Sequence, residues 1–211
     1  MTMTPAQAWE QLQQGNERFV TGSAQHPRQD SARRQELAHE QHPFATVFAC
    51  SDSRVATELI FDVGLGDSFE IRNAGQVASD SAIGSIEYGV GILHTPVLVV
   101  LSHDECGAVR AAIDSRAADA APLPPQIAHL ISPIVPAVRS VSKTAAGENL
   151  DAAAVDAAAV GREHLRGTIT ELLQRSEIIA QAVADGSLAI VGANYRLSEG
   201  RVIPDILIGL D

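Results

Sequence analysis

Three apolar runs along the chain have the length and composition of buried β-strands. They cover Phe44–Ala49, Pro96–Leu101 and Leu188–Val191. An unbroken apolar run of this kind is typical of a parallel strand buried on both faces of a sheet. Over Ser81–Leu93, apolar residues instead recur three or four positions apart. That spacing predicts a helix with one face toward the core.

Weaker strands and further helices complete the pattern. Strands are predicted over Ser68–Arg72 and Arg201–Ile208, the second at a sheet edge because Pro204 cannot donate a backbone hydrogen bond. Helices are predicted over Pro5–Val20, Ser31–Gln41, Val55–Phe61, a segment beginning at Cys106 or Gly107, Ile127–Val141, Ala152–Leu165, and a segment that a capping box at Thr168 begins and Gly186 ends. Strands that alternate with helices indicate an α/β fold with a mainly parallel central β-sheet flanked by helices.

The 211 residues are expected to form a single domain, 1–211, with hydrophobic residues at 45%, a fraction typical of folded globular proteins. Residues 1–42 are predicted to form an N-terminal helical arm and residues 43–211 the α/β core. The net charge of −11 argues against a nucleic-acid partner, whose phosphates would be repelled. No apolar run approaches the roughly 20 residues of a membrane span, and the first residues lack a signal-peptide pattern. We therefore expect no membrane partner and a cytoplasmic location.

Residues with catalytic or metal-binding chemistry follow two of the apolar runs. Cys50-Ser51-Asp52-Ser53-Arg54 comes after the first, and Ser102-His103-Asp104-Glu105-Cys106-Gly107 comes after the second. Together they hold both cysteines of the chain. In α/β sheets, ligands bind beyond the carboxyl ends of the strands, so both stretches fall where a site is expected.

His103 and Cys106 have the spacing of a metal-ligand pair, and Cys50 can supply a third ligand. Two thiolates and one imidazole suit zinc, and three protein ligands leave a fourth position open for chemistry. Spacing does not prove that Cys50 meets the pair. Two inert, buried cysteines are one alternative, and a non-catalytic module with structural zinc or oxidation-sensing cysteines is another. A disulfide is disfavoured in a reducing cytosol.

Asp52 and Arg54 lie next to the predicted ligand Cys50. An aspartate at this spacing can reach the metal's fourth position or its bound water, and a nearby guanidinium can hold that carboxylate through two hydrogen bonds. The alternative is a surface ion pair that contributes ~0–1 kcal/mol.

These stretches resemble the zinc motifs of the β-class carbonic anhydrases. The first motif is Ala49-Cys50-Ser51-Asp52-Ser53-Arg54-Val55, and the second is His103-Asp104-Glu105-Cys106-Gly107-Ala108. Between them, Phe69-Glu70-Ile71-Arg72-Asn73-Ala74-Gly75 and Ser85-Ile86-Glu87-Tyr88 also fit the family. The resemblance implies that Cys50, His103 and Cys106 bind one zinc ion per chain and that Asp52 and Arg54 form the catalytic dyad.

The resemblance also implies a substrate pocket. Gln41 matches a glutamine that donates a hydrogen bond to bicarbonate, and Phe69, Ala74 and Tyr88 match the apolar wall that holds carbon dioxide. One branch of the family has a tryptophan three residues before its first cysteine, whereas this chain has Val47. That difference favours the other, plant-like branch.

The implied activity is the reversible hydration of carbon dioxide to bicarbonate and a proton by zinc-bound hydroxide, which is the reaction of a zinc lyase. A relative that hydrolyses carbonyl sulfide or carbon disulfide with the same ligands is an alternative.

The family implies a homodimer or homotetramer in which the helix over residues 5–20 reaches a partner. In the alternative, Trp9 and Phe19 of that helix pack on their own subunit. Ser102 occupies a position that is usually glycine, a change we expect to be tolerated if its φ is negative.

Overall fold

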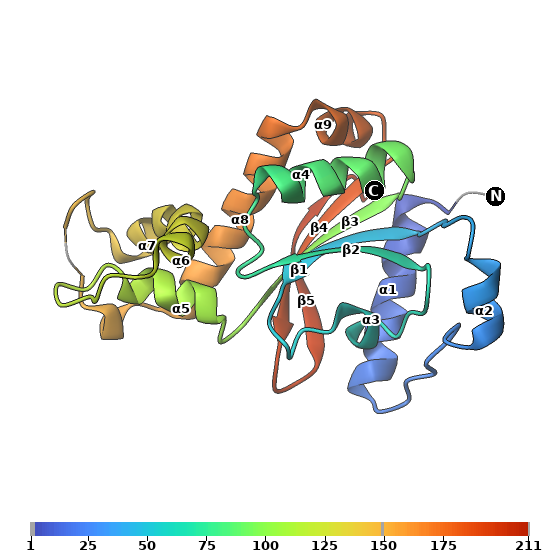
Figure 1. Cartoon of the computed structure of the whole chain (residues 1–211), viewed down its shortest axis with the longest axis horizontal. Helices are drawn as coiled ribbons and strands as arrows, with labels where there is room; N and C mark the ends of the chain where they lie inside the picture. Colours follow the sequence, from blue (N-terminus) through green and yellow to red (C-terminus); the bar gives the residue numbers. More distant parts are fainter. Residues whose placement is uncertain (1–2, 149, 211) are drawn as a thin grey trace.

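A five-stranded sheet forms the centre of the chain, described here by a computed structural model over residues 3–148 and 150–210 (Figure 1). The strands are β1 (Ala45–Cys50), β2 (Ser68–Asn73), β3 (Val97–His103), β4 (Ala189–Arg196) and β5 (Arg201–Ile208), in the order β2-β1-β3-β4-β5. The first four are parallel, and β5 runs antiparallel at the edge. The predicted α/β fold with a mainly parallel sheet is therefore confirmed.

Strand register brings the carboxyl ends of the central strands together. Cys50, the last residue of β1, pairs with Asn73, the last residue of β2. Ala49 pairs with Leu101, so β3 continues two residues farther, to His103. The predicted ligands of β1 and β3 thus emerge at one end of the sheet.

Helices cover both faces of the sheet, because alternate strand residues point to opposite sides. On one side, Trp9 and Leu12 of α1 (Pro5–Val20) join a core cluster with Val47, and α3 (Thr57–Ile60) packs there as well. On the other side lie α4 (Asp80–Glu87), the π-helical turn Tyr88–Ile92, α8 (Ala157–Arg175) and α9 (Glu177–Ala184). The short α2 (Ser31–Glu36) buries no residue.

A third core cluster lies beyond the carboxyl ends of the strands. It is built by α5 (Gly107–Asp114), α6 (Pro125–Ile131) and α7 (Val135–Ser142), at the left of Figure 1, with 3-10 turns at Ser132–Ile134 and Ala152–Ala154. Cys50 and Cys106 belong to this cluster, together with Val109 and Ile134. The cysteines are therefore enclosed by helices that follow β3 in the chain.

Some predicted helix boundaries are wrong. Thr168 does not begin a helix, because it is buried in the middle of α8, whose N-cap is Asp156. The break comes at Ser176, whose hydroxyl accepts the backbone N–H of Ile179 and caps α9. The helix predicted over 31–41 ends at Glu36, and Leu37 is its C-cap residue.

The N-terminal helix packs on its own chain. Trp9 is 6% exposed and sits in the core of the sheet it covers, with Phe19 packed against the same cluster. Trp9 and Phe19 therefore pack on their own subunit, as in the alternative to a helix that reaches a partner. Within the described residues, no helix is long and apolar enough to cross a membrane.

Candidate metal centre

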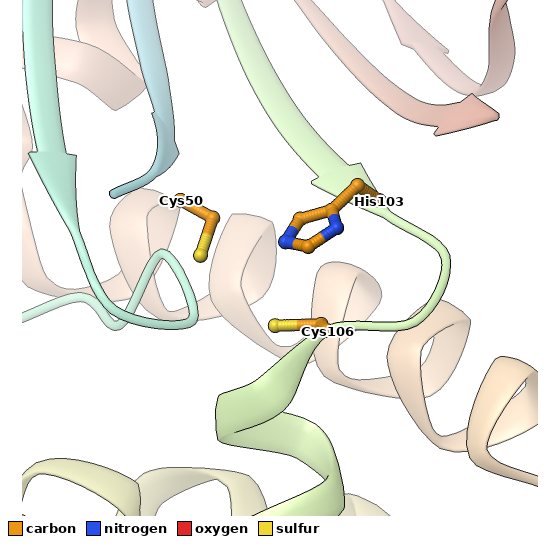
Figure 2. Close-up of side chains that lie close together, drawn as sticks. All are labelled: Cys50, His103 and Cys106. Carbon is orange, nitrogen blue, oxygen red and sulfur yellow. The ribbon is translucent and has the colours of Figure 1, made fainter. Parts of the chain in front are cut away.

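Two sulfur atoms and one imidazole converge at the carboxyl end of the sheet (Figure 2). Cys50 ends β1, His103 ends β3, and Cys106 is the N-cap residue of α5. One ligand atom from each lies within 4.8 Å of the other two, and all three residues are buried. The structure therefore brings together the three residues that the sequence predicts as ligands.

The His103 ring is oriented for a metal. Its Nδ1 lies 2.7 Å from the Asp104 carbonyl oxygen. That oxygen can only accept, so Nδ1 carries the proton and Nε2 presents a lone pair. Nε2 is buried, and no described residue offers it a hydrogen bond. An unpaired imidazole nitrogen facing two sulfur atoms fits a zinc ion, with the backbone carbonyl fixing the ring as is usual around metal ligands.

The two thiols compete for one negative charge. A hydrogen bond from the Cys106 thiol lowers the pKa of Cys50 to about 4. The same hydrogen bond to Cys50 raises the pKa of Cys106. A second thiolate at this spacing therefore needs a compensating positive charge, which a divalent cation supplies.

Asp52 lies at the edge of the cluster and is held by Arg54. Arg54 donates from Nε to Oδ1 at 2.9 Å and from Nη2 to Oδ2 at 2.7 Å, and its backbone N–H also reaches Oδ1. The guanidinium keeps the pKa of Asp52 well below its usual range. Oδ2 lies 4.0 Å from His103 Nε2, so an ionised carboxylate faces the metal position.

Comparisons with known proteins agree on one family. The carbonic anhydrase family model matches residues 45–202. The chain is 43% identical over 200 residues to carbonic anhydrase 2 of Mycobacterium tuberculosis, covering 94% of this chain and 92% of the relative. It is 42% identical over 199 residues to the carbonic anhydrase of Mycolicibacterium smegmatis, with coverage of 94% and 92%. The chain belongs to the β-class carbonic anhydrases. It is an enzyme that hydrates carbon dioxide, and its Cys-His-Cys cluster is typical of the zinc site of this family.

Solved structures show the same architecture. The β-carbonic anhydrase CcaA aligns with a TM-score of 0.66 at 26% identity, covering 93% of this chain and 86% of that one. A chain from the crystal structures of two tetrameric β-carbonic anhydrases of Sordaria macrospora aligns with a TM-score of 0.68 at 21% identity. The alignment covers 93% of this chain and 95% of that one. At that identity the second likeness concerns the fold alone.

Arg72 ties the loop after Cys50 to β2. Its Nε donates to the Cys50 carbonyl at 3.0 Å, and its Nη2 donates to the Asp52 carbonyl at 2.8 Å. Arg72 belongs to the Phe69–Gly75 motif, but the sequence predicts no role for its side chain. Its position could have indicated this supporting role, because Arg72 lies one residue before the end of β2, next to the strand that carries Cys50.

Gly75 and His164 form a second support that sequence reasoning missed. The Gly75 N–H donates to Cys50 Sγ at 3.3 Å, and the Gly75 carbonyl accepts a hydrogen bond from His164 Nε2 at 2.8 Å. Gly75 has φ +80°, and a Cβ there would lie 2.9 Å from Ala108 Cβ. Only glycine therefore fits this turn without displacement. His164 belongs to the buried face of α8, where burial lowers its pKa and keeps it neutral.

Replacing His164 with alanine is expected to weaken zinc binding about 10–100-fold, the usual cost of losing an outer partner of a ligand. The loss follows because the Gly75 turn, which supports Cys50 Sγ, is no longer anchored to α8. Competition with a chelator would measure the zinc affinity. Thr168→Val is a matched control one turn later, since it removes a buried hydroxyl that has no partner among the described residues. Equal zinc affinity in both variants would show that His164 merely packs.

The predicted substrate residues are not gathered around the cluster of their own chain. Ala74 adjoins Gly75 near Cys50. Phe69 pairs with Thr46, four residues before the Cys50–Asn73 pair, which places it about 13 Å away along the strand. Its ring lies 5.9 Å from that of Tyr88, which is 47% exposed. Gln41 is exposed and precedes β1, at the end of the strand opposite Cys50.

Ser102 fits its position in β3. It is buried, pairs with Asn194 of β4, and is not among the residues with positive φ. The condition under which serine can replace glycine is therefore met, and the ligand His103 follows it in regular strand geometry.

Proposed function

We propose that Cys50, His103 and Cys106 hold the catalytic zinc ion and that Asp52 and Arg54 are the catalytic dyad. The observation that carries this proposal is the buried, unpaired Nε2 of His103, which faces two sulfur atoms with the Asp52 carboxylate 4.0 Å away. When bound, zinc activates a water molecule for attack on carbon dioxide.

The residues around the ion perform the other tasks. Asp52, kept ionised by Arg54, accepts a hydrogen bond from the attacking group and orients it toward the substrate carbon. Arg54 also donates to the Glu105 carbonyl at 3.1 Å, which joins the loops that carry the ligands. Ala74, half-buried beside Gly75, offers apolar surface near the ion. Purified enzyme should hold one zinc per chain and hydrate carbon dioxide at pH 8–9 in a stopped-flow assay. Zinc without turnover would favour a structural site.

We also propose that the chain belongs to the plant-like branch. The support is Val47, which stands three residues before Cys50 and is fully buried in the core formed with α1. A valine there cannot supply the indole that characterises the other branch. We further propose that 1–211 is one domain and that it is cytoplasmic, where both cysteines stay free as ligands rather than forming a disulfide.

The active enzyme is proposed to be a homodimer, or a homotetramer made of such dimers. Gln41 precedes β1, Phe69 lies near the start of β2 and Tyr88 begins the π-helical turn, away from the carboxyl ends of the strands that carry the zinc ligands. We infer that they do not reach the zinc site of the same chain. They can serve a site only if it belongs to a second copy. The exposed Tyr88 and Gln41 side chains are free to do so, and a two-fold axis would complete both sites at once.

Intersubunit complementation tests this arrangement. Neither Cys106→Ser nor the double variant Gln41→Ala/Tyr88→Ala should be active alone, because one lacks zinc and the other lacks the substrate pocket. When the two chains are co-expressed with different tags, about one quarter of wild-type activity is expected, because half of the random dimers are mixed and each restores one site. If purified mixed dimers are no more active than the two parents, each pocket is built within one chain.

A further inference from the structure

A cavity lies beside the metal centre on the β4 and β5 side of β3. It has a volume of about 310 Å³ and reaches from the His103–Gly107 loop to the start of α8 and to β5. Much of its wall is apolar, including Val109, Ala157, Ile203 and Pro204. A cavity of this size, apolar with a few polar groups, has the character of a small-molecule site.

The cavity meets the metal centre at His103 and Cys106 but lies on the opposite side of β3 from Cys50 and Asp52. Cys50 and Asp52 come from β1 and the loop that follows it, on one side of β3. The cavity is walled by Asn194 and Arg196 of β4 and by β5, on the other side. Neither Cys50, Asp52 nor Arg54 lines it. The proposed catalytic dyad therefore does not account for it.

Two arginines in the cavity wall have no partner within the described residues. Arg162 of α8 and Arg196 of β4 are each half-buried, and neither guanidinium forms a hydrogen bond or an ion pair there. Of the three carboxylates in the wall, Asp205 pairs with Arg166, and Asp104 Oδ1 accepts the neutral Leu197 N–H. The remaining one, Glu105, is exposed.

The third arginine of the wall already has partners. Arg110, the third arginine of the wall, pairs with Asp114 and donates to the Ala152 carbonyl. Ala157 and Ala158 bring the first turn of the long helix α8 to the wall. The Asp156 carboxylate caps this end of the helix and accepts the Ala159 N–H, so the helix end adds no uncompensated positive charge. Two guanidinium groups without partners therefore lie next to an apolar surface, and Asp104 and Glu105 are the carboxylates of the wall that have no cationic partner among the described residues.

We propose that this cavity binds a small organic carboxylate. Its carboxylate group pairs with Arg162 and Arg196, and its apolar body lies against Val109, Ile203 and Pro204. Guanidinium groups bind carboxylates through directed, charge-assisted hydrogen bonds, and the apolar wall selects an organic anion over an inorganic one. The ligand would also contact the loop that carries His103 and Cys106.

Calorimetric titration of the zinc enzyme with benzoate tests the proposal. Arg162→Gln and Arg196→Gln are each expected to weaken benzoate binding about 10-fold or more, since a hydrogen bond to a charged group contributes ~1.5–3 kcal/mol. Arg34→Gln is the matched control, because Arg34 is exposed on α2 and lies outside the cavity. It should bind benzoate as the wild type does.

Two results would overturn the proposal. If the wild type and the three variants bound benzoate equally well, benzoate would bind outside the cavity. The zinc ion, to which anions also bind, would be one such place. Inorganic phosphate is the second probe, because it offers negative charge without an apolar body. If phosphate bound as tightly as benzoate and lost affinity in the same two variants, the cavity would be an inorganic-anion site and the proposed ligand class would be wrong.

Discussion

Replacing Cys106 with serine is expected to remove both the zinc ion and nearly all carbon dioxide hydration. A serine hydroxyl is not ionised near neutral pH and is a hard, weak ligand for zinc, so only Cys50 and His103 would remain. Zinc per chain by mass spectrometry and turnover by stopped flow would measure the two losses.

The neighbouring variant Glu105→Gln provides the control. Glu105 shares the loop between His103 and Cys106, but its side chain is exposed and only its carbonyl accepts from Arg54. This variant should retain one zinc per chain and wild-type turnover. Full zinc content and activity in Cys106→Ser would contradict the ligand assignment.

Replacing Asp52 with asparagine is expected to leave zinc in place while lowering turnover by about 10²–10⁴-fold, the range typical of a positioned proton acceptor. Asparagine has the same shape but lacks the charge that pairs with Arg54. It also presents an N–H where the carboxylate accepted a hydrogen bond. Because the pKa of Asp52 is held low, the wild-type carboxylate is ionised throughout the assay range, and its protonation does not complicate the comparison.

Asp114→Asn is a matched change of charge at an exposed site on α5, where Asp114 pairs with Arg110. Its turnover should equal that of the wild type. Loss of zinc from Asp52→Asn would instead make Asp52 part of the metal's support. If the turnover of Asp52→Asn stayed within a few-fold of wild type, the Asp52–Arg54 pair would not be the catalytic dyad.

The centre of the sheet was predictable from the sequence because β1 and β3 are buried on both faces. The apolar runs of β1 and β3 leave no other way to bury so many consecutive side chains. Helix boundaries were harder, because local signals compete with packing. Thr168 and Glu171 have the sequence of a capping box, yet the Asp156 cap and continuous burial along α8 carry the helix through that point.

The metal ligands were also predictable, because two strands in parallel register end side by side. The supports from Arg72 and His164 were not, since they depend on how distant segments pack. His164 is 89 positions from the carbonyl that it binds, and no local pattern indicates such a contact. The separation of Gln41 and Tyr88 from their own Cys50 was equally hidden, because a motif does not reveal whether its residues act within one chain or between two.

The junction of β1 and β3 also has a topological consequence. Cys50 and His103 are 53 positions apart, and the chain between them contains α3, β2 and α4. An ion bound to both closes that segment as a cross-link. By the chain-entropy relation used for disulfides, closing a loop of this length disfavours the unfolded state by about 4 kcal/mol. Loss of the ion would then lower the free energy of unfolding as well as end catalysis, so thermal stability and turnover should decline together as metal is withdrawn.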